Sequence, residues 1–358
     1  MNLLAKMKKR GGWRSGILPI VLLVSIVLVL SGCAVKEGGT GSRNSDAVTG
    51  ERKDRLTVVT TLFPYYDFTR QIAGDLVDLS MVIPAGMDSH SFEPTPADIR
   101  KIQQADVLIA NGGEMEQWLT QVLDSLDTDT LTVVYMMDYV EVVEEEVVEG
   151  MEHDHDHDHE ETVCTEDHDH SLHDEDESRY EIEYDEHIWT SPVNAMKITE
   201  IIGETLKNED PDHAILYEEA KTSYLEKLEK IDGEFRKIRE EAVHDIMVMG
   251  DKFPLRYFAD EYGLRYRAAF SGCSSDTEPS AKTIAYLIDK IREEKLPVVY
   301  YLELSSHRVA EIIGEETGAK PLLFHSCHNV TRREFESGVT YLQLMEQNVK
   351  NLREGLCQ

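Results

Sequence analysis

Residues 214–243 read AILYEEAKTSYLEKLEKIDGEFRKIREEAV, a stretch with no proline and a single glycine, Gly233. Its apolar residues recur at steps of three and four: Leu225, Leu228, Ile231, Phe235, Ile238 and Ala242. This spacing predicts one amphipathic helix. At 1.5 Å per residue, about 30 residues would extend roughly 45 Å. Such a helix is long enough to join two lobes as a rigid strut.

Strand and helix patterns alternate on both sides of this predicted helix. The strands expected before it are residues 56–62, 77–83, 107–110 and 131–135, with helices at 65–73, 96–104 and 115–126. Those expected after it are strands 245–249, 264–270, 297–302 and 322–324, with helices at 280–294, 306–317 and 339–353. Such alternation favours parallel sheets covered by helices. We therefore expect an α/β fold of two similar lobes with mainly parallel sheets, residues 55–190 and 244–358, joined by helices in residues 191–243.

A segment rich in Asp, Glu and His, residues 141–186, interrupts the first lobe. Between residues 152 and 179 it has almost no large apolar side chain, so it cannot bury enough surface to offset the entropy of ordering. We expect a mobile loop with auxiliary metal-binding histidines, and the alternative is a solvated charged loop with no specific role. These histidines are His153, His155, His157, His159, His168, His170 and His173.

The N-terminus has the features of an exported, lipid-anchored protein. Basic residues between Lys6 and Arg14 precede an apolar run, residues 17–30, which is too short for a comfortable membrane span but suits a signal peptide. The run ends in Leu30-Ser31-Gly32-Cys33, which resembles the lipobox of bacterial lipoproteins. We expect a signal peptide over residues 1–32, lipidation of Cys33, a flexible tether over residues 33–54 and a location on the extracellular side of the cell membrane. An ordinary signal peptide or a membrane anchor is the alternative.

The formal charge of −33 argues against a nucleic-acid binder, which needs basic patches to neutralise phosphates. An acidic surface suits solubility and attracts cations. Besides Cys33, the chain has Cys164, Cys273, Cys327 and Cys357, which could pair in an oxidising compartment. Cys273 and Cys327 both follow predicted strands of the second lobe. We expect a disulfide between them, and the alternative makes Cys327 a soft metal ligand.

Candidate metal ligands lie where ligands bind in α/β sheets, beyond the carboxyl ends of the strands. His90 precedes the helix that opens at Pro96, and His187 precedes the helix that opens at Pro192. The second lobe offers four more after its strands: Asp251, Glu303, His325 and His328. Each has a plainer interpretation as a capping, surface or ion-pairing residue. Their shared topological position predicts a metal site in the cleft between the lobes.

Several motifs carry a more specific resemblance. They are Phe63-Pro64, Ser89-His90-Ser91-Phe92-Glu93-Pro94-Thr95-Pro96, His187-Ile188-Trp189-Thr190-Ser191-Pro192, Tyr257-Phe258-Ala259, Tyr262-Gly263-Leu264, Glu278-Pro279-Ser280, and Tyr341-Leu342 with Met345 and Asn348. With them the chain resembles the metal-binding solute-receptor lipoproteins of bacterial ABC importers, the zinc and manganese group that includes the ZnuA-type receptors. The resemblance implies one ligand from each histidine motif, His90 and His187. The acidic His-rich loop is similar to that of the family's zinc receptors.

Two positions depart from that family. The loop in which the resemblance implies a third ligand, His or Glu, reads Gly250-Asp251-Lys252-Phe253-Pro254, and a later position that is often Asp falls at His325. The inferred ligands are His90, His187, His325 and Asp251. Glu303 and His328 are expected as outer or alternative ligands. Three imidazoles and a carboxylate suit tetrahedral Zn²⁺, whereas Mn²⁺ prefers more oxygen ligands and Ni²⁺ also accepts imidazole.

The expected function is capture of a divalent transition metal, Zn²⁺ first, outside the cell and its delivery to the permease and ATPase subunits of an ABC importer. We expect a monomer that is not an enzyme. An extracellular zinc hydrolase is one alternative, although the sequence has neither a His-Glu-x-x-His pair nor a Gly-x-Ser-x-Gly motif. A surface metal buffer or adhesin is the other. The long helix would limit hinge closure, so metal binding is expected to order loops and to shift one lobe modestly.

Overall fold

The computed structural model describes residues 55–151, 183–274 and 278–358. The expected signal peptide, the tether, Cys33 and the loop histidines between residues 153 and 173 lie outside the described residues. Within the described ranges, no helix combines the length and the apolar character needed to cross a membrane. Both sheets belong to the same unit of the chain.

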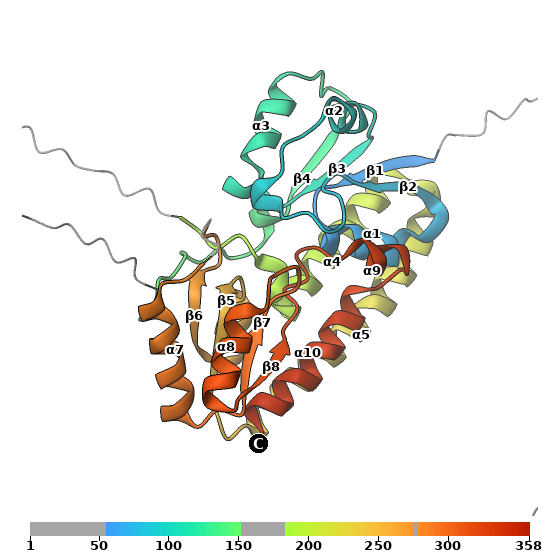
Figure 1. Cartoon of the computed structure of the whole chain (residues 1–358). Helices are drawn as coiled ribbons and strands as arrows, with labels where there is room; N and C mark the ends of the chain where they lie inside the picture. The colour runs from blue at the N-terminus through green and yellow to red at the C-terminus, as the bar shows by residue number, and fades with distance from the viewer. Residues whose placement is uncertain (1–54, 152–182, 275–277) are drawn as a thin grey trace, which may run out of the picture. The chain divides into compact units, whose positions relative to one another are not determined.

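A four-stranded parallel sheet with strand order β2-β1-β3-β4 forms the first lobe (Figure 1). Its strands are β1 (Leu56–Thr60), β2 (Val77–Met81), β3 (Val107–Ala110) and β4 (Thr132–Tyr135). The helices of this lobe are α1 (Phe63–Ala73), α2 (Pro96–Gln103) and α3 (Gln117–Asp124). All residues of β3 are buried, as expected for a central parallel strand that is covered on both faces.

The second lobe repeats this order of strands, β6-β5-β7-β8, again with parallel pairing. Its strands are β5 (Ile246–Phe253), β6 (Arg265–Ser271), β7 (Val298–Tyr301) and β8 (Lys320–Leu323). Its helices are α6 (Arg256–Tyr262), α7 (Ala281–Glu294), α8 (Arg308–Thr317), α9 (Arg332–Glu336) and α10 (Tyr341–Leu356). The predicted α/β fold of two similar lobes with parallel sheets is confirmed.

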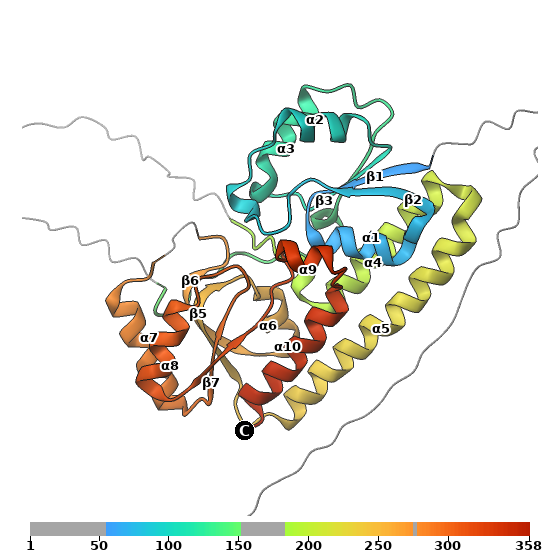
Figure 2. The same ribbon diagram turned by 45° about the vertical axis from the view of Figure 1, so that its right-hand side comes forward.

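The predicted long helix is present as α5 (Ala214–Glu241), and it follows α4 (Pro192–Glu209). Its 28 residues span about 42 Å at 1.5 Å per residue. α5 packs against α1 and α4 beside the first sheet and against α6 and α10 beside the second, so one helix runs along both lobes (Figure 2). Its buried residues are Tyr217, Lys221, Tyr224, Leu228, Ile231, Phe235 and Ile238. Short 3-10 turns complete the chain: η1 (Gly74–Leu76), η2 (Ser89–Ser91), η3 (Glu114–Glu116), η4 (Met136–Tyr139), η5 (Ile188–Thr190) and η6 (Pro211–His213).

The C-terminal segment ties the lobes together a second time. The backbone N–H of Tyr341, at the start of α10, donates to Asp67 Oδ2 in α1 over 2.7 Å. Arg70 of α1 pairs with Asp67 and donates to the Val339 carbonyl over 2.6 Å. Because α10 also packs along α5, a wide hinge opening would have to break buried contacts from two helices.

Strand β5 runs further than the sequence predicts. It was expected to end at Met249, but it continues to Phe253 with a shift of register between Met249 and Lys252. Gly250 and Asp251 are poor strand residues, which is why the predicted strand stops before them. The register shift is a local bulge that accommodates them. The short helices α6 and α9 were not predicted at all, because neither is long enough to show a clear helical periodicity.

Candidate metal centre

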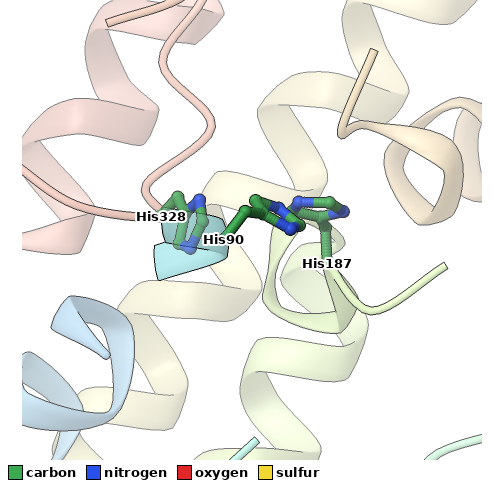
Figure 3. Close-up of side chains that lie close together, drawn as sticks. All are labelled: His90, His187 and His328. Atoms are coloured by element: carbon green, nitrogen blue, oxygen red, sulfur yellow. The ribbon is translucent and has the colours of Figure 1, made fainter. Parts of the chain in front are cut away.

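His90 lies in η2, in the connection between β2 and α2 (Figure 3). The carboxylate of Asp88 accepts a hydrogen bond from the His90 backbone N–H over 3.1 Å and caps this turn. The loop is also pinned from the second lobe, because the Asn329 side chain donates to the carbonyls of Pro84 (2.9 Å) and Met87 (2.8 Å). His90 is therefore presented on a short loop that both lobes hold.

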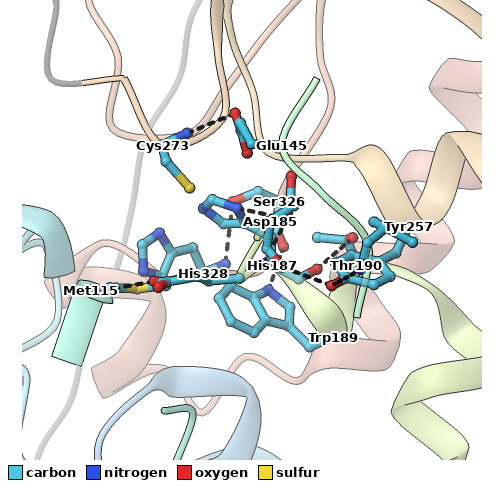
Figure 4. Close-up of polar contacts among 12 residues, drawn as sticks. Met115, Glu145, Asp185, His187, Trp189, Thr190, Tyr257, Cys273, Ser326 and His328 are labelled. Carbon is cyan, nitrogen blue, oxygen red and sulfur yellow. Dashed lines mark hydrogen bonds and ion pairs between the residues drawn. The ribbon is translucent and has the colours of Figure 1, made fainter. Parts of the chain in front are cut away.

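His187 lies just before η5 and α4, and only 1% of its surface is exposed. Asp185 Oδ1 accepts from the backbone N–H of His187 over 2.8 Å and lies 3.2 Å from its ring nitrogen Nδ1 (Figure 4). A carboxylate on one ring nitrogen fixes the orientation of the imidazole and leaves Nε2 available to a ligand. The Tyr257 hydroxyl of α6 donates to the Asp185 carbonyl over 2.7 Å, which anchors this segment to the second lobe.

His328 lies in the loop after β8 and meets the first lobe directly, since its Nε2 contacts the hydroxyl of Ser89. Its backbone N–H donates to the Ser326 hydroxyl over 3.2 Å, and the Ser326 carbonyl accepts from the Trp189 indole over 2.9 Å. The Trp189 ring lies 5.3 Å from the His328 ring and 5.5 Å from the His187 ring. Trp189 therefore supports two of the three imidazoles.

The rings of His90, His187 and His328 lie close together (Figure 3), and their spacing makes them a nearly equilateral triangle. Their centroids are 5.7, 5.7 and 5.6 Å apart, and one nitrogen of each ring lies within 4.8 Å of the others. Tetrahedral Zn²⁺ with bonds of about 2.0–2.1 Å places its nitrogen ligands roughly 3.3–3.4 Å apart. The Nε2 atom of His90 is buried and has no hydrogen-bond partner among the described residues. A small contraction would turn this triangle into three ligands of one ion.

The triangle opens into a cavity of about 390 Å³ between the lobes. Gly86, Met87 and Asp88 line it from the first lobe. The second lobe contributes residues from β5, from the connection between β7 and α8, and from the loop after β8. The predicted position of the site, in the cleft beyond the carboxyl ends of the strands, thus coincides with a real cavity.

His325, expected as the third ligand, does not belong to this triangle. Its Nδ1 accepts the backbone N–H of Cys327 over 2.9 Å, and its own N–H donates to Asn348 over 2.8 Å. Cys327, which lies between the two histidines, has a positive φ of 60°, an uncommon conformation for a residue other than glycine. The structure therefore groups His328, and not His325, with His90 and His187 in the lining of the cavity.

Asp251 and Glu303 line the cavity but lie outside the group of three histidines. The two carboxylate oxygens of Asp251 accept the backbone N–H groups of Lys252 (2.9 Å) and Leu302 (3.3 Å). Glu303 accepts the backbone N–H of Ser326 over 2.8 Å and also its hydroxyl. Asp251 is part of strand β5 and not of a loop, which limits its reach toward the histidines.

The expected disulfide is not formed, since Cys273 and Cys327 are both free thiols. Cys327 is fully buried in the hydrophobic core, and its thiol points to the His325 carbonyl at 3.9 Å, outside the triangle. Cys273 lies beside His187, where its backbone N–H donates to Glu145 over 3.3 Å (Figure 4). Both cysteines follow strands of the second lobe, but this position does not bring their thiols together.

The three imidazoles differ in their proton affinity. Burial, followed by the charge of His187, lowers the pKa of His90 to about 4. Burial and the neighbouring histidines also lower the pKa of His328 well below its usual value. Burial alone would lower the pKa of His187, but the Asp185 carboxylate and the Cys273 side chain outweigh it and raise that pKa well above the usual value. Of the three rings, His187 therefore holds its proton most tightly, and a metal that binds its free nitrogen competes with that proton.

Sequence reasoning missed the residues that position the rings, namely Asp185, Ser326, Asn329 and the indole of Trp189. Asp185 had a visible signal, a carboxylate two residues before a candidate ligand. The other three act through hydrogen bonds between segments far apart in the chain, and no local pattern announces such bonds.

The chain matches the family model described as "Zinc-uptake complex component A periplasmic" over residues 58–355. It is 30% identical over 330 residues to the high-affinity zinc uptake system protein ZnuA of Bacillus subtilis (strain 168), which is 92% of this chain and 97% of that protein. It is 31% identical over 301 residues to the zinc-binding lipoprotein AdcA of Streptococcus pneumoniae (strain ATCC BAA-255 / R6). That match covers 84% of this chain and 56% of AdcA, so the chain spans about half the length of that relative.

Solved structures show the same two-lobe fold. The metal-dependent lipoprotein YcdH from Bacillus subtilis superposes with a TM-score of 0.67 and 29% identity, covering 85% of this chain and all of that one. The Zn(II)-bound ZnuA-like domain of Streptococcus pneumoniae AdcA gives a TM-score of 0.66 and 28% identity, again over 85% of this chain and all of that domain. The family match takes in both sheets and all three histidines of the triangle. The chain therefore belongs to the zinc-uptake complex component A family.

Proposed function

We propose that this chain captures Zn²⁺ outside the cell and delivers it to an ABC importer. The observation that carries the proposal is the convergence of His90, His187 and His328, drawn from both lobes, on one cavity. Relatives across most of the chain support it, because their names describe zinc binding and zinc uptake. The metal is the cargo of the protein and is released after each cycle.

The donor set favours zinc over the harder divalent ions. Three neutral nitrogens suit Zn²⁺, whereas Ca²⁺ and Mg²⁺ select oxygen ligands and Mn²⁺ prefers more of them than this triangle offers. Ni²⁺ also accepts imidazole, so geometry and supply must discriminate against it. We assign His90, His187 and His328 as the ligands and leave the fourth position to an oxygen donor.

Capture and release follow from how the lobes are tied. Contacts such as Asn329 to the Pro84 carbonyl and Tyr341 to Asp67 restrict the lobes to small shifts. To reach the distance between the nitrogen ligands of tetrahedral Zn²⁺, the three ring nitrogens would have to move together by about 1 Å. Docking onto the permease would separate the lobes slightly and would pull His328 away from His90 and His187, which releases the ion.

The remaining parts of the proposal concern the chain around this core. We propose that Cys33 carries a lipid that holds the protein on the extracellular side of the membrane. The permease and ATPase subunits of the importer are the proposed partners, and the receptor acts as a monomer. The histidines between residues 153 and 173 are proposed to gather metal near the cleft when it is scarce.

Calorimetric titration of a soluble form that begins at Thr40 tests the assignment. Zn²⁺, Mn²⁺ and Ni²⁺ are titrated into that form, into a variant without residues 152–179 and into His90→Ala. The proposal expects one tight zinc site that survives loop deletion and that disappears in His90→Ala. Tight binding that vanishes with the loop and ignores His90→Ala would mean that the protein is a metal buffer and not a cleft receptor.

A further inference from the structure

The cavity beside the histidine triangle is much larger than a bare ion requires. Its volume of about 390 Å³ compares with roughly 30 Å³ for one water molecule. It falls within the range of roughly 300–1,000 Å³ typical of small-molecule sites. An ion and a single water would occupy only a small part of this space.

Two basic side chains line this cavity, Lys252 at the bulge of β5 and Arg308 at the start of α8. Among the described residues, neither has a carboxylate within ion-pairing distance, although the chain carries a formal charge of −33. Lys252 is near enough to the triangle for its charge to lower the pKa of both His90 and His328. A positive charge at this place opposes the binding of a cation.

The carboxylates of the cavity wall do not neutralise these groups directly. Each of them accepts backbone N–H groups instead: Asp88 that of His90, Asp251 those of Lys252 and Leu302, and Glu303 that of Ser326. The first turn of α8 adds positive character, because the residues from Ser305 to Val309 line the cavity and the free N–H groups of a helix start attract anions. The cavity therefore combines a cation site with a lining that suits a small anion.

We propose that the metal is bound together with a small di- or tricarboxylate, which takes the fourth coordination position. This inference rests on the proposed function and specifies the missing oxygen donor. One carboxylate of the anion faces the ion at the triangle, and a second carboxylate pairs with Lys252 and Arg308. Such charge-assisted pairs are about twice as strong as neutral hydrogen bonds. The anion offsets the repulsion between Lys252 and the ion.

Citrate is the probe for this proposal, titrated into the zinc-loaded and into the metal-free protein, both as the soluble form that begins at Thr40. Zinc retention is measured by metal analysis after each titration, which separates ternary binding from removal of the ion. Binding of one citrate to the zinc-loaded protein, with zinc retained and with weaker binding to the metal-free protein, is expected. Citrate that only strips the zinc, or phosphate that binds as tightly as citrate, would overturn the assignment to carboxylates.

Lys252→Met distinguishes a direct role in anion binding from a purely structural role, because it should change citrate affinity and zinc affinity differently. Removing this charge should weaken citrate binding to the zinc-loaded protein by about tenfold or more. It should leave zinc affinity in citrate-free solution unchanged or higher, since a repulsive charge is gone. Arg308→Gln should weaken citrate binding in the same direction. The matched controls are Lys227→Met on the exposed face of α5 and Arg100→Gln on the exposed face of α2, which should change neither affinity.

The outcomes separate the two proposals. Tight zinc binding that depends on His90 but shows no response to citrate would overturn the anion proposal and leave the receptor intact. A chain without a tight, His90-dependent zinc site would overturn the receptor itself. A Lys252→Met variant that loses zinc affinity in citrate-free solution would also contradict the anion proposal, because Lys252 would then support the site structurally.

Discussion

His90 and His328 reach the same cluster through different kinds of backbone. His90 lies a few residues before α2, whose first turn is fixed by a capping box between Thr95 and Asp98. His328 lies in the loop after β8 and directly follows Cys327, which has a positive φ of 60°. A capped helix start can be recognised in the sequence, so the ligand just before it can be predicted. The positive φ of Cys327 leaves no such pattern, and the predicted ligand His325 lies three residues from His328. The metal ligands of the first lobe are therefore easier to predict from the sequence than those of the second.

The strongest test of this comparison removes one ligand that precedes a capped helix, His187 before α4, and one that follows the positive φ of Cys327, namely His328. The double substitution His187→Ala/His328→Ala should lower zinc affinity by at least about 1,000-fold, because even changes outside the first ligand shell cost about 10–100-fold. Competition with a chromogenic zinc chelator measures the change. His244→Ala, a change at the N-terminal edge of β5, is the control and should leave the affinity unchanged. Retention of tight binding by the double variant would refute the triangle.

A smaller effect is expected from the carboxylate behind His187. In Asp185→Asn the ring loses its charged partner, so zinc affinity should fall about 10–100-fold. The pKa of His187 should fall as well, because the Asp185 carboxylate helps to raise it. NMR titration of the His187 ring in the metal-free protein follows that pKa. An unchanged His187 pKa in Asp185→Asn would show that this pair does not control the ring.

Proton release sharpens the comparison between the three rings. The pKa of His187 is raised, so its ring is protonated at neutral pH, whereas the lowered pKa values leave His90 and His328 neutral. Zinc binding at pH 7 should then release about one proton, and apparent affinity should fall tenfold per pH unit below the His187 pKa. Calorimetry in buffers of different ionisation enthalpy counts the protons. Release of none, or of three, would contradict the assigned protonation states.

The smallest effect on zinc affinity is expected from Asn329, which joins the second lobe to the loop that carries His90. Asn329→Ala removes two hydrogen bonds to the loop that carries His90, and it should cost about 1–3 kcal/mol of unfolding free energy. Zinc affinity should fall only a few-fold, since the three ligands remain. Urea denaturation with and without zinc measures both effects, and Asn208→Ala on exposed α4 surface is the control. A loss of stability no larger than that of the control would show that Asn329 does not hold the loop.

The alternation of strands and helices was enough to predict the fold, because buried parallel strands and amphipathic helices leave periodic patterns. The long helix 214–243 was predicted within two residues of its observed end, Glu241. The extension of β5 through Gly250 and Asp251 was not predicted, since it depends on pairing with β6 and not on local preference.

The candidate site was predictable only in part. His90 and His187 stand in motifs with capped helix starts, and the structure places both in the cluster. The sequence did not predict that His328, and not His325, would lie with them, and no sequence rule gives the positive φ of Cys327 between the two histidines. The expected pairing of Cys273 with Cys327 failed because the position of a residue after a strand does not determine where its side chain points.

The most direct test is the matched pair His328→Asn and His325→Asn. Asparagine keeps an acceptor near the position of Nδ1, so His325→Asn can still receive the Cys327 N–H and preserve the turn. His328→Asn should lower zinc affinity by more than about 100-fold, beyond the cost of an outer-shell change, whereas His325→Asn should change it by only a few-fold. The reverse order, with His325→Asn abolishing tight binding and His328→Asn tolerated, would contradict the central claim.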